Sequence, residues 1–94
     1  MKSYVIVDAN VINPEKLAEY SAQAAPTVLK YHGKFIAKGS AESLHGEQPF
    51  ANKAVIEFPS EKHARDWYNS EEYQALIPLR SQALDCQFHI AAGV

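Results

Sequence analysis

The stretch ALDCQFHIA, residues 83–91, alternates apolar and polar side chains from its first leucine onward. The apolar set is Leu84, Cys86, Phe88 and Ile90, and the polar set between them is Asp85, Gln87 and His89. Strict alternation is typical of a β-strand that buries one face and leaves the other in a more polar environment. The chain must therefore fold around a sheet whose two faces have different surroundings.

Three other segments have the composition of strands, namely residues 3–12 (SYVIVDANVI), 34–39 (KFIAKG) and 53–59 (KAVIEFP). A helix is predicted between the first two. Asn13 is a suitable N-cap for it, and Pro14 suits its first helical position. The apolar stripe of this helix consists of Leu17, Tyr20, Ala24, Val28 and Tyr31.

Two residues mark irregular points of this helix. Pro26 removes a backbone donor and predicts a kink, but not a full break, because the stripe keeps its phase on both sides. Gly33, which follows His32, is predicted to be the left-handed residue that ends the helix.

A second helical region follows Ser60, a suitable N-cap. It carries two apolar sets, the first made of Ala64, Trp67 and Tyr68, and the second of Tyr73, Leu76 and Ile77. At about 100° per residue these sets point in nearly opposite directions on one continuous helix. We therefore expect a break near Asn69, a restart capped by Ser70, and an end at Pro78.

The order β-α-β-β-α-β predicts an α+β, ferredoxin-like fold, in which both helices lie on one face of a four-stranded antiparallel sheet. We expect residues 1–94 to form one such domain. The side chains assigned to the helix side are Val5, Val7, Ala9, Ala54, Ile56, Phe58, Leu84, Cys86, Phe88 and Ile90. Those assigned to the other side are Tyr4, Ile6, Asp8, Asn10, Ile36, Lys38, Val55, Glu57, Gln87 and His89.

This second set is too apolar to face water and too polar for a dry core. We predict that two copies close sheet to sheet, as a homodimer in which a cavity is lined by the polar members. The loop at residues 40–52 is long for a compact domain, and loops of this length are often functional or mobile.

Composition limits the partners. The chain has 47% hydrophobic and 21% charged residues and a net charge of −2, so we expect neither nucleic acid nor an anionic membrane as a partner. Cys86 is the single cysteine, which excludes an internal disulfide and a CxxC metal site. No segment reads as a signal peptide or a membrane span, and a cytoplasmic location is expected.

The stretch AVIEFPSEKHARDWYNSEEYQALIPLR, residues 54–80, resembles the signature of the domain of unknown function 1330 family. The resemblance extends over nearly the whole chain. It departs at His32, Lys38 and Ser40, where the family more usually has glycine, arginine and glycine. The resemblance implies a small bacterial protein of the dimeric α/β-barrel superfamily, whose relatives include cofactor-free monooxygenases, isomerases and dehalogenation-type enzymes. It implies no particular reaction.

Three residues are candidates for proton transfer. Asp8 and Glu57 lie within strands, which disfavour acids, so each must be solvated, paired or shifted in pKa. His89 is the best placed of the four histidines, because it points to the mixed face. The alternatives for the two acids are a structural ion pair with Lys38 and exposure at the rim of the barrel.

Five residues are candidates for ligand binding, namely Lys38, Tyr68, Tyr73, Arg80 and His32. A buried phenol seeks a polar partner, and Arg80 is suited to hold a carboxylate of a ligand or of Glu57. The alternatives are core packing for the tyrosines, and pairing with Glu71 or Glu72 for Arg80. No HxH or HxxxH pair is present, so no metal site is expected.

Two functions fit these residues. The first is a homodimer that binds a small acidic or aromatic metabolite, as a binding protein or as an enzyme that transfers a proton and needs no cofactor. The second is a non-catalytic dimerisation or assembly module whose interface is filled and has no ligand cavity. An RNA-recognition domain has the same strand order, but KAVIEF lacks the stacking aromatics that such a domain requires.

Overall fold

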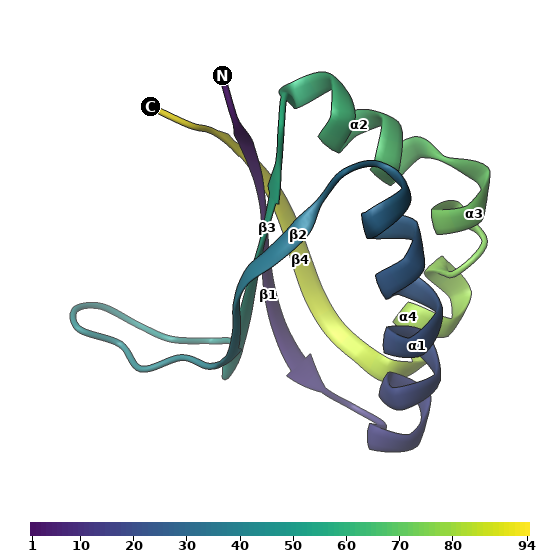
Figure 1. Cartoon of the computed structure of the whole chain (residues 1–94). Helices are drawn as coiled ribbons and strands as arrows, with labels where there is room; N and C mark the ends of the chain where they lie inside the picture. Colours follow the sequence, from purple (N-terminus) through teal and green to yellow (C-terminus); the bar gives the residue numbers. More distant parts are fainter.

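The computed structural model describes residues 1–94 and has the predicted α+β, ferredoxin-like architecture. The strands are β1 (Ser3–Val11), β2 (Lys34–Ser40), β3 (Asn52–Phe58) and β4 (Leu84–Ala92). The helices are α1 (Pro14–Lys30), α2 (Glu61–Asn69), α3 (Glu71–Gln74) and α4 (Ile77–Ala83). The strands form one antiparallel sheet in the order β2-β3-β1-β4, and all helices lie on one side of it (Figure 1).

Helix α1 begins as predicted. The side chain of Asn13 accepts hydrogen bonds from the backbone N–H groups of Glu15 and Lys16, which satisfies two of the free donors at the helix start. Pro26 lies inside the helix without breaking it. The buried residues of α1 are Tyr20, Ala24, Thr27 and Val28, so its apolar stripe faces the sheet.

The end of α1 corrects the prediction for Gly33. The left-handed residue is His32, with φ 65°, while the N–H of Gly33 reaches back to the carbonyl of Val28 at 2.9 Å. Gly33 is needed for space instead, because a Cβ there would lie 2.6 Å from the ring of Phe58 and 2.8 Å from Val28. The chain thus accepts a histidine in a strained conformation so that a glycine can sit against the core.

The predicted break between α2 and α3 is confirmed. Helix α2 ends at Asn69, and the Ser70 hydroxyl oxygen accepts a hydrogen bond from the Tyr73 N–H, which restarts the helix. The prediction for Pro78 is wrong. It lies in the first turn of α4, where its fixed φ favours a helix start, so it opens a further helix instead of ending one.

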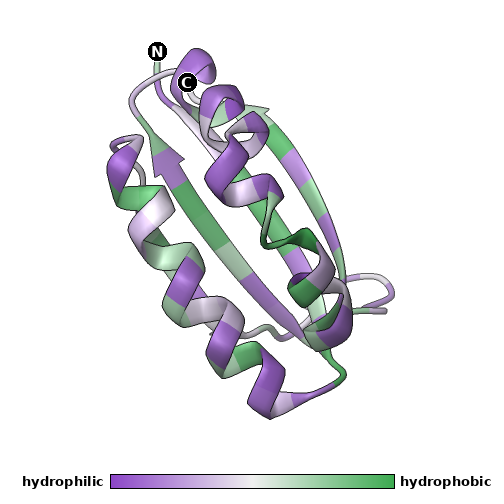
Figure 2. Cartoon of the chain, turned by 90° about the vertical axis from the view of Figure 1, so that its right-hand side faces the viewer, coloured by the Kyte–Doolittle hydropathy of each residue, from purple (hydrophilic) through white to green (hydrophobic).

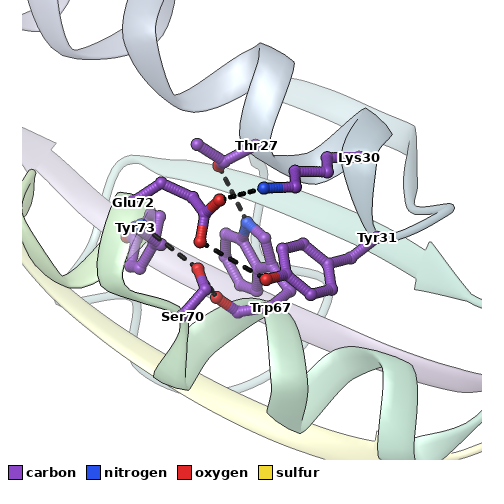
Figure 3. Close-up of polar contacts among 7 residues, drawn as sticks. All are labelled: Thr27, Lys30, Tyr31, Trp67, Ser70, Glu72 and Tyr73. Atoms are coloured by element: carbon purple, nitrogen blue, oxygen red, sulfur yellow. Dashed lines mark hydrogen bonds and ion pairs between the residues drawn. The ribbon is translucent and has the colours of Figure 1, made fainter.

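Contacts between α1 and the corner formed by α2 and α3 hold the helices together (Figure 3). The indole N–H of Trp67 donates to the Thr27 hydroxyl at 3.0 Å, and Lys30 forms an ion pair with Glu72. Glu72 also accepts a hydrogen bond from the Tyr31 hydroxyl at 3.3 Å. In Figure 2, α1 runs along one side of the helix layer and α2 to α4 run along the other.

The register separates two faces of the sheet. The covered face is the helix side, and its buried members are Val5, Val7, Ala9, Ile56 and Phe58. Ala54, Leu84, Cys86 and Phe88 pack against this core, but Ile90 is exposed near the end of β4. The open face is the opposite side and carries Tyr4, Ile6, Asp8, Asn10, Lys53, Val55, Glu57, Gln87 and His89.

A bulge in the edge strand β2 corrects the prediction for Lys38. Phe35 pairs with Ile56 and Ala37 with Val55, so Ile36 has no partner between them. The extra residue reverses the alternation, and Lys38 then pairs with Ala54. Because Ala54 belongs to the covered face, Lys38 lies on the helix side of the sheet and not on the open face.

The predicted long loop is present as residues 41–51, which join β2 to β3. It projects from the sheet on the side away from the helices (Figure 1). Leu44 in this loop is fully exposed. The loop is fixed at its base, where the Asn10 side chain donates to the carbonyl of Pro49 and accepts from the N–H of Ala51, both at 2.8 Å.

Candidate functional site

The two acidic candidates of the open face are both paired with lysines. Asp8 lies directly opposite Lys53 on β3 and forms an ion pair with it at 2.7 Å. Glu57 forms an ion pair with Lys2 at 2.6 Å, and this hydrogen-bonded contact holds the pKa of the Glu57 carboxyl below its usual range. Lys38 is not the partner of either acid, since it lies on the other face of the sheet.

His89 lies on the open face as predicted. It is exposed and lies in one cross-strand row with Ile6 and Val55. Ile6 is the middle residue of this row, since it pairs with Val55 on one side and with His89 on the other. Gln87 lies beside it, opposite Asp8. The open face therefore has an apolar centre of Ile6 and Val55, flanked by the imidazole and by the Asp8–Lys53 pair.

Arg80 lies on the covered side among aromatic rings. One of its terminal nitrogens donates to the hydroxyls of Tyr68 and Tyr73, each at 3.1 Å, and its guanidinium lies 4.6 Å from the ring centre of Phe88. It forms no ion pair, so neither Glu57 nor Glu71 nor Glu72 is its partner. Burial opposes the charge of Arg80, but the bonds to the two phenols raise its pKa overall.

The phenol network continues into α1. The hydroxyls of Tyr73 and Tyr20 lie 2.6 Å apart, and burial raises the pKa of both groups. Arg80 donates to Tyr73, so the chain of contacts runs from the guanidinium through two phenols to the inner side of α1. These tyrosines stay neutral at physiological pH and act as hydrogen-bond groups, not as bases.

A pocket of about 220 Å³ lies between α1 and the sheet, at the β2 edge. Its buried floor includes Tyr20, Val28, Ile56 and Trp67. Its outer wall includes Phe35 and Lys38, which are exposed on β2. Its wall on α1 is formed by Ser21, Ala24 and Ala25, whose small side chains leave space between the helix and the edge strand.

His32 is remote from both faces. Its ring lies 5.6 Å from the ring of His63, whose Nδ1 is 2.7 Å from the Ser60 hydroxyl. No third metal-ligating side chain joins these two histidines. The arrangement is an edge-to-face contact between the end of α1 and the start of α2.

The eight predicted site residues are thus divided among four places. Asp8, Glu57 and His89 share the open face, whereas Tyr68, Tyr73 and Arg80 share the aromatic cluster in the helix layer. Lys38 lines the pocket, and His32 lies apart. Sequence reasoning missed Phe35, Tyr20 and Ala25 as pocket residues. The available signal was the run of small residues on α1, which leaves a helix incompletely packed.

The chain has no helix long and apolar enough to cross a membrane. No curated protein matches the sequence. The family model described as "Domain of unknown function (DUF1330)" matches residues 2–94.

Solved structures show the same fold. A protein of unknown function from Rhodopseudomonas palustris is 17% identical, with a TM-score of 0.79 over 99% of this chain and 82% of that one. A dimeric ferredoxin-like protein of unknown function from Jannaschia sp. CCS1 is 9% identical, with a TM-score of 0.76 over 99% and 100% of the two chains. SnoaB, a cofactor-independent oxygenase from Streptomyces nogalater, is 7% identical, with a TM-score of 0.72 over 99% and 93%.

Proposed function

Since the chain belongs to the DUF1330 family, which names a domain and no reaction, we propose a function from its geometry: a homodimer whose protomers each bind a small, mainly apolar metabolite. The pocket between α1 and the sheet is the binding site in this proposal. The open faces of two protomers form the dimer interface.

The pocket is the observation that carries the proposal. Of its 19 lining residues, 14 are hydrophobic, and a concave, mainly apolar site with few polar groups is the usual form of a small-molecule site. Its volume of about 220 Å³ is below the roughly 300–1,000 Å³ of pockets for drug-sized ligands. The pocket therefore suits a smaller molecule.

The open face supports the dimer. Ile6 and Val55 at its centre are only half-buried, and no element of the same chain covers them (Figure 1). A second copy laid on this face would remove them from water, and ion pairing already balances the charges of Asp8 and Glu57. The loop at residues 41–51 projects on this side and is placed to contact the second copy. The similar structure from Jannaschia is a dimeric ferredoxin-like protein, which supports a dimer for this chain.

Proton transfer by Asp8, Glu57 and His89 remains a second candidate function at the open face. The cofactor-independent oxygenase among the similar structures favours an enzyme over a binding protein, because it has the same fold and acts without a cofactor. The ion pairs of both acids favour the non-catalytic assembly module instead, in which the interface is filled. His89 differs from the two acids, because its side chain is exposed and forms no ion pair.

The experiment uses 1-octanol as a neutral probe and the fluorescence of Trp67, the single tryptophan, as the signal. Trp67 lines the pocket floor, so octanol bound there should change its emission and raise the melting temperature. Ala25→Phe should fill the mouth and abolish both effects. Ala22→Phe is the matched control, since Ala22 is exposed on the same helix and does not line the pocket.

Equal octanol binding by the Ala25→Phe and Ala22→Phe variants would show that octanol binds outside this pocket, and would contradict the proposal. Absence of any binding by the wild-type protein would contradict it as well. Asp8→Asn or His89→Ala should leave octanol binding unchanged, because both side chains lie on the opposite face of the sheet.

A further inference from the structure

We propose that the ligand of the pocket is an apolar organic acid, with its anionic group at Lys38 and its apolar body on the floor formed by Trp67 and Ile56. This inference rests on the proposed function and adds the chemical class of the ligand. It is carried by the position of Lys38, the charges of the pocket wall and the distribution of burial.

The bulge at Ile36 brings Lys38 to the pocket. In a regular strand, Phe35 and Lys38 lie three residues apart and point to opposite faces. The extra residue places both on the covered face, opposite Ile56 and Ala54. The ammonium of Lys38 lies 5.0 Å from the centre of the Phe35 ring, so the cation stands over the aromatic wall of the pocket. Bulges often redirect side chains at functional sites.

The pocket wall has one charged side chain, that of Lys38, and no acid. Lys53 also borders the pocket, but its side chain lies on the open face of the sheet, where it pairs with Asp8. Lys38 forms no ion pair with any carboxylate of the chain, because the six ion pairs use other residues. A cation without an anionic partner at the mouth of an apolar pocket favours a ligand that is negative at one end.

The different burial of the lining residues indicates how the ligand is oriented in the pocket. Trp67 is 1% exposed and Ile56 2% exposed, whereas Phe35 is 40% exposed. The apolar part of a ligand therefore gains most by reaching the floor, and a charged part stays hydrated at the mouth beside Lys38. Asn52 also lines the pocket and offers an amide to the same end of the ligand.

The test compares octanoate, 1-octanol and octylammonium, which have the same chain length and differ in charge, by titration of Trp67 fluorescence at low ionic strength. The wild-type protein should bind octanoate about fivefold more tightly than octanol, and octylammonium most weakly. Lys38→Met should remove the preference for octanoate and leave octanol binding unchanged. Lys38→Arg should keep the preference.

Lys62→Met is the matched control, because Lys62 is exposed on α2 and far from the pocket lining, and it should retain the preference for octanoate. Equal binding of octanoate and octanol by the wild-type protein would overturn this inference and leave the proposed function intact. A preference that survives in Lys38→Met would also overturn it. Absence of binding by all three probes would overturn the proposed function, and the inference with it.

Discussion

The two faces of the sheet share the same strands and have opposite characters. On the covered face, Phe58 and Trp67 are fully buried, and their rings lie 5.5 Å apart. On the open face, no residue of β1 is fully buried, and Asp8 forms a cross-strand ion pair with Lys53. One face is thus complete within a single chain. The other has an apolar centre that no helix of its own chain covers, and the loop at residues 41–51 is hydrogen-bonded to Asn10 at its edge.

In the proposed function, the two faces have separate tasks. A ligand pocket needs a rigid, dry wall, which α1 and the covered face supply. A protein interface needs an apolar centre with a polar rim, and the open face has Ile6 and Val55 at its centre with ion pairs around them. The two tasks should respond to different substitutions.

The largest expected effect is the loss of the dimer. Ile6→Glu places a charge at the centre of the open face, where a second copy cannot solvate it, and should convert a dimer into a folded monomer. Light scattering at micromolar concentration measures the mass, and octanol binding reports that the pocket is intact. Leu29→Glu is the control, since Leu29 is 68% exposed on α1 and should leave the dimer unchanged. A monomeric wild-type protein would refute this assignment of the open face.

A smaller effect is expected at the end of α1, and it tests how tightly the covered face is packed. Gly33→Ala places a Cβ 2.6 Å from the Phe58 ring and should lower the free energy of unfolding by about 1–3 kcal/mol. His32→Gly should instead raise it, by about 1 kcal/mol, because it relieves a positive φ of 65°. Urea denaturation measures both, and equal effects of the two substitutions would contradict the roles given to these neighbours.

The smallest effect concerns the ion pair of Glu57 with Lys2. The pKa of Glu57 is lower in the folded chain than its ordinary value of 4.5, so its contribution to stability is present above pH 4.5 and is lost as the pH falls through the folded-state pKa. The melting temperature of the wild-type protein should fall more than that of Glu57→Gln between pH 6 and pH 3. Parallel curves for the two proteins would show that the pair contributes nothing measurable.

The sequence predicts the order of the strands and helices because the patterns that mark them involve residues close together in the chain. Alternation in residues 84–90 identifies β4 and its two sides, and the opposed apolar sets around Asn69 require the break that Ser70 caps. The N-cap at Asn13 is equally local. Each of these features depends on neighbours within a few residues, so each can be found without knowledge of the tertiary structure.

The site depends on pairings between distant residues, which sequence patterns do not contain. A single unpaired residue, Ile36, reverses the side of Lys38, and nothing in KFIAKG marks it. The partners of Asp8 and Glu57 follow from strand register, and the contact of Gly33 with Phe58 joins a helix end to a different strand. Arg80 bonds to phenols and not to the expected carboxylate, because three aromatic rings from separate elements, those of Tyr68, Tyr73 and Phe88, surround it.

The most direct test of the division between the faces is a methyl NMR titration of the protein with 1-octanol. Methyl groups of Val7, Val28 and Ala54 line the pocket, whereas those of Ile6 and Val55 lie on the open face. Shifts confined to the first group, with the second unchanged, are the predicted result. Shifts of Ile6 and Val55 with Val28 unchanged would place the ligand on the open face and contradict the assignment.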